Sequence, residues 1–248
     1  MVEPAMRASC PSVAGRRSMI GRMVRLIVFG DRDMRFETHR AIDHTLGLLP
    51  DDVDARWQPT DEAFDLAGAD AVWFAPGTPY RDDAAAYRAV EQARTSGTPM
   101  YGTCGGFQYM VLEFARNVAG IGNAAHAETD PDAEQAVVAP LSCSLVGQRR
   151  TIHPVARERL AEIVGVEPFS GFHYCSYGLN PAYREQLEAA GLRITATADD
   201  AGIEGIELPS HPFAMATLFQ PQMESLETGE LHPLLAALVQ AAKSVSPT

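Results

Sequence analysis

The residues with the clearest chemical signature lie between Pro99 and Gln108, which read Pro-Met-Tyr-Gly-Thr-Cys-Gly-Gly-Phe-Gln. A short apolar run leads into a cysteine, Cys104, that is flanked by glycines and followed by a helix-forming stretch. Glycines remove side chains where a sharp strand-to-helix turn would crowd them, and such a turn exposes a nucleophile at the carboxyl end of a sheet. The positive end of the following helix favours the thiolate form of cysteine. The pattern predicts a reactive thiol at Cys104, and a structural cysteine at a tight turn is the alternative.

The elements that would position this cysteine alternate between strand and helix. Strands are expected at residues 24–30, 55–58 and 70–77, and helices at residues 36–48, 82–95 and 106–118. This alternation predicts βαβ units and a parallel sheet, in which ligands bind at the carboxyl ends of the strands. Gly77 and Cys104 both lie at such ends, so the two residues are expected to meet.

The second half of the chain has a less regular pattern. Strands are expected at residues 136–145, 148–152, 192–198, 203–208 and 213–219, and helices at residues 155–163, 181–190 and 231–243. Residues 172–179 are expected to be irregular. Because no internal repeat or linker stands out, residues 24–248 are expected to form one α/β domain, preceded by a disordered N-terminal tail over residues 1–23.

The composition limits the classes of partner. Lys and Arg total 20 against 32 Asp and Glu, a net charge of −12, which disfavours binding to nucleic acid or to an anionic membrane. No apolar run is long enough for a signal peptide or a membrane span. The four cysteines are Cys10, Cys104, Cys143 and Cys175. Their wide spacing argues against a disulfide framework or a zinc cluster and favours a reducing cytoplasm. We expect a small-molecule substrate, no metal and no cofactor, and a homo-oligomer stays open.

The segment Gly102-Thr-Cys-Gly-Gly-Phe-Gln108 fits Gly-x-Cys-x-Gly-x-Gln and resembles the nucleophile motif of class I glutamine amidotransferases. Further blocks at residues 122–128, 137–141, 173–180 and 211–222 occur in the same order as in the glutaminase domain of CTP synthase. The nearest fit is a subfamily related to the C-terminal region of CTP synthase, with cysteine or selenocysteine as nucleophile. The resemblance covers nearly the whole chain from Val24 and implies a flavodoxin-like three-layer α/β sandwich with a mostly parallel central sheet.

The resemblance also implies roles for individual residues. Cys104 would form a thioester, and the N–H groups of Gly77 and Gly105 would form an oxyanion hole, in which one donor is worth about 3 kcal/mol. Glu128 would hold a substrate ammonium group, and Gln108 would brace the pocket. The alternatives are a solvated loop acid at Glu128 and a helix-surface residue at Gln108.

Three positions depart from the family pattern. Gln220 stands where the family has the general-base histidine of its Phe-His-Pro-Glu motif, and Gln222 replaces the glutamate. An amide cannot take a proton from a thiol. Ser176 replaces the arginine that grips the glutamine α-carboxylate, which would lose its bidentate partner. The substrate pocket would be lined by Ser176, Tyr177 and Gln220. Ordinary glutamine hydrolysis by a Cys-His-Glu triad is therefore not expected.

A different histidine would have to supply the missing base. The candidates are His126, close to the expected acidic residue of the pocket, and His173, in the loop that lines the glutamine pocket of the family; each could instead be structural. Cys175 shares that loop and could bring a second thiol near the nucleophile. His39 and His44 are expected to be solvated or interfacial.

These observations predict a stand-alone cysteine-dependent hydrolase or amide-transfer enzyme that acts on a small polar substrate through a thioester at Cys104. The alternative is a catalytically degenerate relative that binds a metabolite or a partner protein, or senses redox state through the thiol. A third hypothesis is a detached amidotransferase subunit completed by a synthetase partner.

Overall fold

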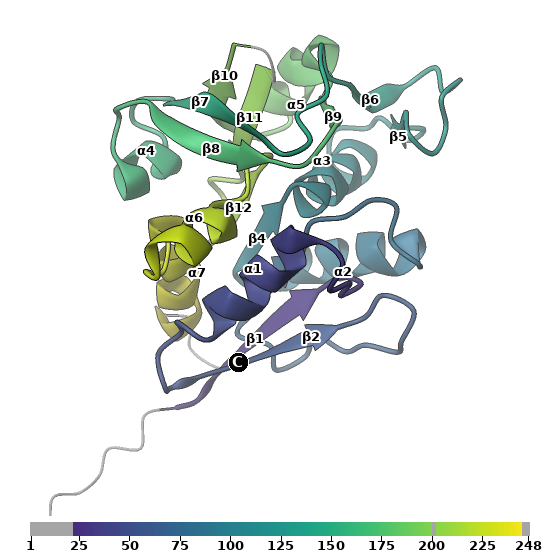
Figure 1. Cartoon of the computed structure of the whole chain (residues 1–248). Helices are drawn as coiled ribbons and strands as arrows, with labels where there is room; N and C mark the ends of the chain where they lie inside the picture. Colours follow the sequence, from purple (N-terminus) through teal and green to yellow (C-terminus); the bar gives the residue numbers. More distant parts are fainter. Residues whose placement is uncertain (1–21, 200–201, 245–248) are drawn as a thin grey trace, which may run out of the picture.

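The computed structural model describes residues 22–199 and 202–244 (Figure 1). The tail predicted over residues 1–23 lies outside this part of the chain except for its last two residues, of which Arg22 forms an ion pair with Asp70. In the described ranges, no helix combines the length and the apolar character that a membrane span requires.

The centre of the described fold is a nine-stranded sheet with the order β2-β1-β3-β4-β12-β11-β10-β7-β8. Its parallel half consists of β1 (Val24–Phe29), β2 (Val53–Gln58), β3 (Ala71–Phe74), β4 (Met100–Thr103) and β12 (Ala214–Thr217). Antiparallel pairing extends the sheet through β11 (Gly202–Glu207), β10 (Arg193–Ala198), β7 (Gln148–Pro154) and β8 (Phe169–His173). The parallel sheet predicted from the sequence is therefore the half that leads to Cys104.

Helices cover both faces of the parallel half (Figure 1). One layer contains α1 (Glu37–Leu46), α6 (Pro221–Thr228) and α7 (Pro233–Ser244), and the other contains α2 (Asp83–Ser96) and α3 (Gly105–Asn117). The shorter helices α4 (Arg159–Val164), η1 (Pro181–Tyr183) and α5 (Arg184–Ala189) lie beside the antiparallel strands. A second sheet joins β5 (Ala125–His126), β6 (Ala136–Pro140) and β9 (Tyr177–Leu179).

The two layers explain why the central strands are apolar throughout. Every residue of β3 and β4 is buried, because a parallel strand with helices on both faces has no solvated side. Trp73 and Tyr101 are among the largest fully buried side chains. Their polar atoms are satisfied within the core, where the Trp73 indole donates to Thr103 and the Tyr101 hydroxyl bonds Thr217. The core therefore fixes the ends of β3 and β4, from which the site is built.

The structure corrects three sequence-based assignments. The strand expected over residues 136–145 ends at Pro140. The segment expected to be irregular, residues 172–179, contains the end of β8 and all of β9, so that only residues 174–176 lie outside strands. Helix α6 was not predicted, although Pro221 in its first turn is a common way to begin a helix.

Candidate active site

Cys104 occupies a strained turn between β4 and α3. Its backbone angles are φ 51° and ψ −105°, a left-handed conformation that side chains other than glycine rarely adopt. The Cys104 N–H donates to the Thr217 carbonyl oxygen of the neighbouring strand at 2.9 Å, and α3 begins at the next residue. The turn therefore holds the sulfur at the carboxyl edge of the parallel strands.

Close contact between main chains brings Gly77 to this turn. A Cβ atom on Gly105 would lie 2.0 Å from the Gly77 carbonyl oxygen, and one on Gly106 would lie 2.2 Å from the Phe74 carbonyl oxygen. Only glycine permits such an approach. The N–H groups of Gly105 and Gly77 lie close enough to the Cys104 sulfur to lower the pKa of its thiol. The oxyanion of a tetrahedral adduct at this sulfur would form beside the same groups.

His39 sets the orientation of one of these donors. Its Nδ1 accepts from the Asp33 N–H at 2.8 Å, so its Nε2 carries the proton and donates to the Pro76 carbonyl oxygen at 3.0 Å. The Pro76–Gly77 peptide is planar and trans, which points the Gly77 N–H opposite to that carbonyl. His39 is 4% exposed and lines the cavity, so the expectation that it is solvated or interfacial is wrong. Its burial lowers the pKa of His39 and keeps the ring neutral.

The electrostatic surroundings favour the Cys104 thiolate. The neighbouring Cys175 thiol, together with the N–H groups of Gly105 and Gly77, lowers the pKa of Cys104 against the opposing effects of burial and of the Glu128 carboxylate. The same interaction with Cys104, together with burial, raises the pKa of Cys175. Cys104 Sγ lies 3.7 Å from the Tyr174 carbonyl oxygen, to which the protonated thiol can donate a hydrogen bond. Two thiols therefore share the site, and Cys104 ionises first.

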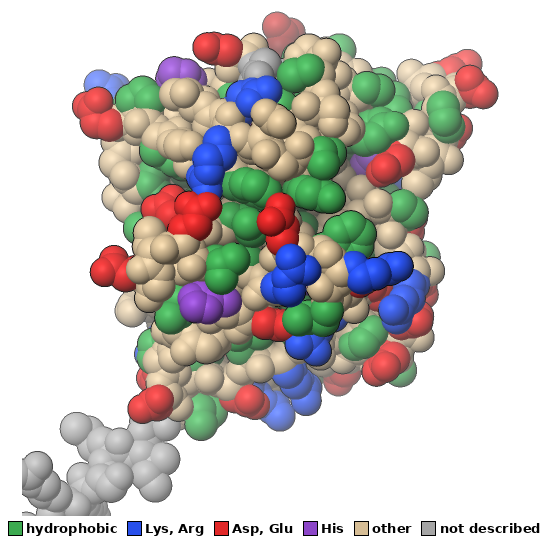
Figure 2. Space-filling model, in the orientation of Figure 1, with side chains coloured by type: hydrophobic (Ala, Val, Ile, Leu, Met, Phe, Trp, Pro, Cys, Tyr) green, Lys and Arg blue, Asp and Glu red, His purple; other side chains and the backbone are tan. Residues whose placement is uncertain are grey.

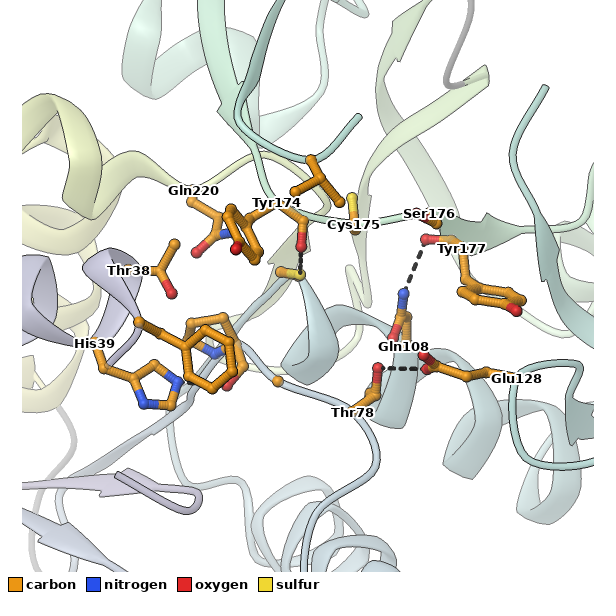
Figure 3. A pocket seen from close by; sticks show the side chains of 15 residues that line it. Thr38, His39, Thr78, Gln108, Glu128, Tyr174, Cys175, Ser176, Tyr177 and Gln220 are labelled. Atoms are coloured by element: carbon orange, nitrogen blue, oxygen red, sulfur yellow. Dashed lines mark hydrogen bonds between the residues drawn. The ribbon is translucent and has the colours of Figure 1, made fainter. Parts of the chain in front are cut away.

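A cavity of about 380 Å³ opens above the sulfur. Of the predicted site residues, it is lined by Gly77, Cys104, Gln108, Glu128, Ser176, Tyr177 and Gln220. Figure 3 shows Thr78 donating to the Glu128 carboxylate, at 3.0 Å, on one side of the cavity. Gln108 donates to the Tyr177 carbonyl oxygen at 2.8 Å and is buried, so it is not a residue of the exposed helix surface.

Exposed apolar side chains surround the mouth of this cavity. Phe36, Val146 and Tyr174 line it and are 42%, 45% and 37% exposed. The rings of Phe36 and Tyr174 meet edge to face with their centroids 6.2 Å apart. In Figure 2, hydrophobic side chains form a band across the middle of the face shown. A ligand with an apolar portion, or another protein surface, would find a complementary surface here.

The structure does not place either candidate histidine as a base. His126 Nδ1 accepts from the Glu128 N–H at 3.1 Å, and Nε2 bonds Gln108 Oε1 at 3.1 Å. Burial lowers the pKa of His126 to about 4. His173 is fully buried with Nε2 2.9 Å and 3.0 Å from the two carboxylate oxygens of Glu204. Neither histidine lines the cavity, so His126 braces Gln108 and His173 is engaged by the buried Glu204 carboxylate.

An amide, Gln220, lies at the position that we predict to correspond to the family's general base. Gln222 Nε2 donates to Gln220 Oε1 at 2.8 Å. Gln220 Nε2 is buried with no hydrogen-bond partner in the described part of the chain, and Gln220 lines the cavity. A buried amide N–H without a partner is costly unless a ligand accepts from it. At the position of the family's arginine, the Ser176 hydroxyl bonds Ser144 at 3.0 Å. The cavity lining contains no Lys or Arg.

The sheet and the cysteine on its strand-to-helix turn define an α/β protein with a nucleophile elbow. Comparison with known families makes this class specific. The family model for glutamine amidotransferase class-I matches residues 34–233, and the chain belongs to this family.

Several relatives support the resemblance to CTP synthase. The CTP synthase of Nocardioides sp. is 36% identical over 213 residues, which are 77% of this chain and 37% of that protein. The CTP synthase of Rubrobacter xylanophilus is 32% identical over 242 residues, 91% of this chain and 43% of that protein. The chain thus spans 37% to 43% of the length of these relatives.

A solved structure confirms the class I fold. The glutaminase domain of Trypanosoma brucei CTPS with bound acivicin matches with a TM-score of 0.77 at 23% identity. The match covers 90% of this chain and 95% of that chain. The predicted class I glutamine amidotransferase fold and the likeness to the CTP synthase glutaminase domain are therefore confirmed.

Proposed function

We propose that the chain is a cysteine-dependent acyl-transfer enzyme in which Cys104 forms a thioester with a small polar substrate, without the Cys-His-Glu triad of the family. The observation that carries this proposal is the close approach of the Gly105 and Gly77 main chains beside Cys104, where a Cβ on Gly105 would lie 2.0 Å from the Gly77 carbonyl oxygen and where the N–H groups of both glycines lower the pKa of the thiol. Such donors stabilise the charge that develops on a carbonyl oxygen under attack.

The first step needs no separate base, because the pKa of Cys104 is lowered by its surroundings and a thiolate is intrinsically nucleophilic. The sulfur attacks the carbonyl carbon, a C–S bond forms, and the N–H groups hold the oxyanion. Collapse of this intermediate expels the leaving group, which departs with a proton from water or from the Cys175 thiol. The second step lacks a base to activate water, which favours transfer to an incoming amine or thiol over hydrolysis.

The charges around the cavity define the substrate class. Glu128, supported by Thr78, is the one carboxylate in the lining, and it suits an ammonium group. Ser176 offers a hydroxyl where a carboxylate would need a cation. The Gln220 amide can accept or donate one further hydrogen bond. We therefore propose an amine-bearing amide or ester that has no free carboxylate near Ser176.

A matched pair of substrates tests this proposal. Glutamine and its α-carboxamide differ only at the group that would face Ser176, which is a charged carboxylate in glutamine and a neutral carboxamide in the other compound. We expect the α-carboxamide to give more thioester, detected as a mass adduct on the intact protein and released by hydroxylamine, with no adduct on the Cys104→Ser variant. If a panel of amine-bearing amides and esters gave no adduct, the proposal would be overturned. Faster turnover of glutamine itself would refute the proposed loss of the triad.

The alternative is a degenerate relative that binds a metabolite or a partner, such as a synthetase, without turnover. The unpartnered Gln220 amide and the exposed apolar mouth at Phe36, Val146 and Tyr174 favour it. Under this alternative, calorimetry would detect ligand binding of equal affinity in the wild type and in Cys104→Ser, and no adduct would form.

A further inference from the structure

We propose that Cys104 and Cys175 are a peroxide-sensitive thiol pair that closes to a disulfide inside the cavity and is reopened by a dithiol reductant. The formation of this bond needs no acyl substrate, so the proposal stands independently of the acyl-transfer function. Its consequence for that function, reversible loss of the nucleophile, rests on the preceding proposal.

The geometry brings the two thiols together. Both side chains line the same cavity, and each residue is 6% exposed. The Tyr174 carbonyl oxygen, one residue before Cys175, lies 3.7 Å from Cys104 Sγ (Figure 3). The neighbouring Cys175 thiol lowers the pKa of Cys104, which agrees with this placement. A third described cysteine, Cys143, is exposed and does not line the cavity.

The backbone around Cys175 holds it at this position. The Leu145 N–H donates to the Cys175 carbonyl oxygen at 2.9 Å, and the Leu141 N–H donates to the Ser176 carbonyl oxygen at 2.9 Å. Residues 174–176 form no helix or strand, so the segment that carries Cys175 is short and lies outside the regular ladders. A disulfide requires the two sulfur atoms to approach to about 2.05 Å, and this segment is the part of the chain that would adjust.

The two thiols differ in the way that such a reaction requires. Cys104 is the more acidic thiol and Cys175 the less acidic, so oxidation begins at Cys104. The Cys104 thiolate attacks one oxygen of hydrogen peroxide, an S–O bond forms, and the O–O bond breaks to leave hydroxide, which becomes water. The Cys175 sulfur then attacks the sulfenic sulfur, an S–S bond forms, and the S–O bond breaks. The second water carries away the Cys175 proton, so two thiols have lost two electrons and one peroxide has been reduced.

The direct test is a disulfide map of the full chain after treatment with hydrogen peroxide, in the absence of any acyl substrate. We expect one intramolecular link between Cys104 and Cys175, with Cys104 oxidised about tenfold faster than Cys143. Dithiothreitol should restore both thiols. The Cys143→Ser variant, changed outside the cavity, should form the same link at the same rate.

Replacing the second thiol gives an independent readout. In Cys175→Ser, oxidation should stop at a sulfenic acid on Cys104, which dimedone traps, and no link should form. Should this variant fail to fold, the map of the wild-type protein still decides the question. The proposal is overturned if peroxide leaves Cys104 oxidised without a link to Cys175, or if the dominant link involves Cys10 or Cys143. If the 104–175 link forms, but the panel of amides and esters gives no acyl adduct on the reduced protein, the proposed function is refuted and the thiol pair stands.

Discussion

The two walls of the cavity around Cys104 are built in different ways. One wall is made of main-chain groups, since the turns after β3 and β4 press together until Gly105 and Gly77 touch. The other wall is made of side chains, which come from residues 174–176 and from Gln220 at the start of α6. In the proposed function, the first wall would supply the oxyanion donors and the second would face the rest of the substrate.

This difference would allow the site to combine an elbow with the altered base that we propose. A donor that is a peptide N–H cannot be exchanged by substitution, and its position is enforced by contacts that exclude a Cβ atom. A base or a charged clamp is a single side chain, and the proposed replacements at Gln220 and Ser176 would leave the backbone intact. The two walls should therefore respond differently to mutation.

The largest effect is expected where the main-chain wall is broken. Gly105→Ala would put a methyl group 2.0 Å from the Gly77 carbonyl oxygen, so we expect the free energy of unfolding to fall by more than about 4 kcal/mol. Chemical denaturation measures this loss. Gly122→Ala is the matched control, because a Cβ there meets nothing within 4 Å. An equally mild effect of both changes would show that the close contact is not a constraint.

The next effect is expected from rebuilding the side-chain wall. Gln220→His with Gln222→Glu would return a base and its orienting carboxylate to the cavity, and a positioned general base contributes at least about 10²-fold. We expect ammonia release from the glutamine α-carboxamide to rise by about that factor over the wild type. Gln222→Glu alone restores no base and should not raise it. If the double variant folds but releases ammonia no faster than the wild type, the backbone of this wall does not place the new histidine where it can act as a base.

A smaller effect is expected at His39, which reaches the main-chain wall through Pro76. His39→Ala releases the Pro76 carbonyl, and the less well-oriented Gly77 N–H should slow thioester formation about tenfold. His39→Gln keeps a donor for that carbonyl and should retain most of the rate. Alkylation by iodoacetamide at high pH forms no oxyanion, so His39→Ala should leave it nearly unchanged. An equal slowing of acylation and alkylation would assign His39 a structural role only.

The smallest effect is expected in the pH dependence of Cys104 alkylation, when Cys175 on the side-chain wall is replaced. Cys175 is the largest cause of the lowered pKa of Cys104, and removing a donor that stabilises the thiolate must raise that pKa. The rate at which Cys104 is alkylated should therefore reach half its maximum at a higher pH in Cys175→Ala than in the wild type. Cys143→Ala should leave the profile in place. A shift to lower pH in Cys175→Ala would contradict the stabilising effect of Cys175 on the thiolate.

Much of the fold could be predicted from the sequence because it depends on local patterns. The glycines around Cys104 and the alternation of apolar strands with amphipathic helices indicated the elbow and the parallel half. Helix α6 was not predicted because its sequence, Pro-Gln-Met-Glu-Ser-Leu-Glu-Thr, has a weak apolar face. Its packing against α1 supplies what the local pattern lacks.

The site was less predictable, because it depends on contacts between distant segments. The sequence indicated that an unusual base was needed, but it could not show that His173 is held by Glu204, which lies 31 residues away, or that His126 is held by Gln108. It also could not show that His39 reaches the Pro76 carbonyl. The one available signal was its place at the start of the helix after β1, near the carboxyl edge where ligands bind.

The contact between Gly105 and Gly77 also has a consequence for motion. Two backbone segments that touch directly cannot open apart without breaking the packing beneath them, so the oxyanion donors stay fixed whether or not a ligand is present. Any gating of the cavity must come from the opposite side, where residues 174–176 lie outside regular structure. Amide hydrogen exchange would therefore be slowest at the nucleophile itself and fastest directly across from it.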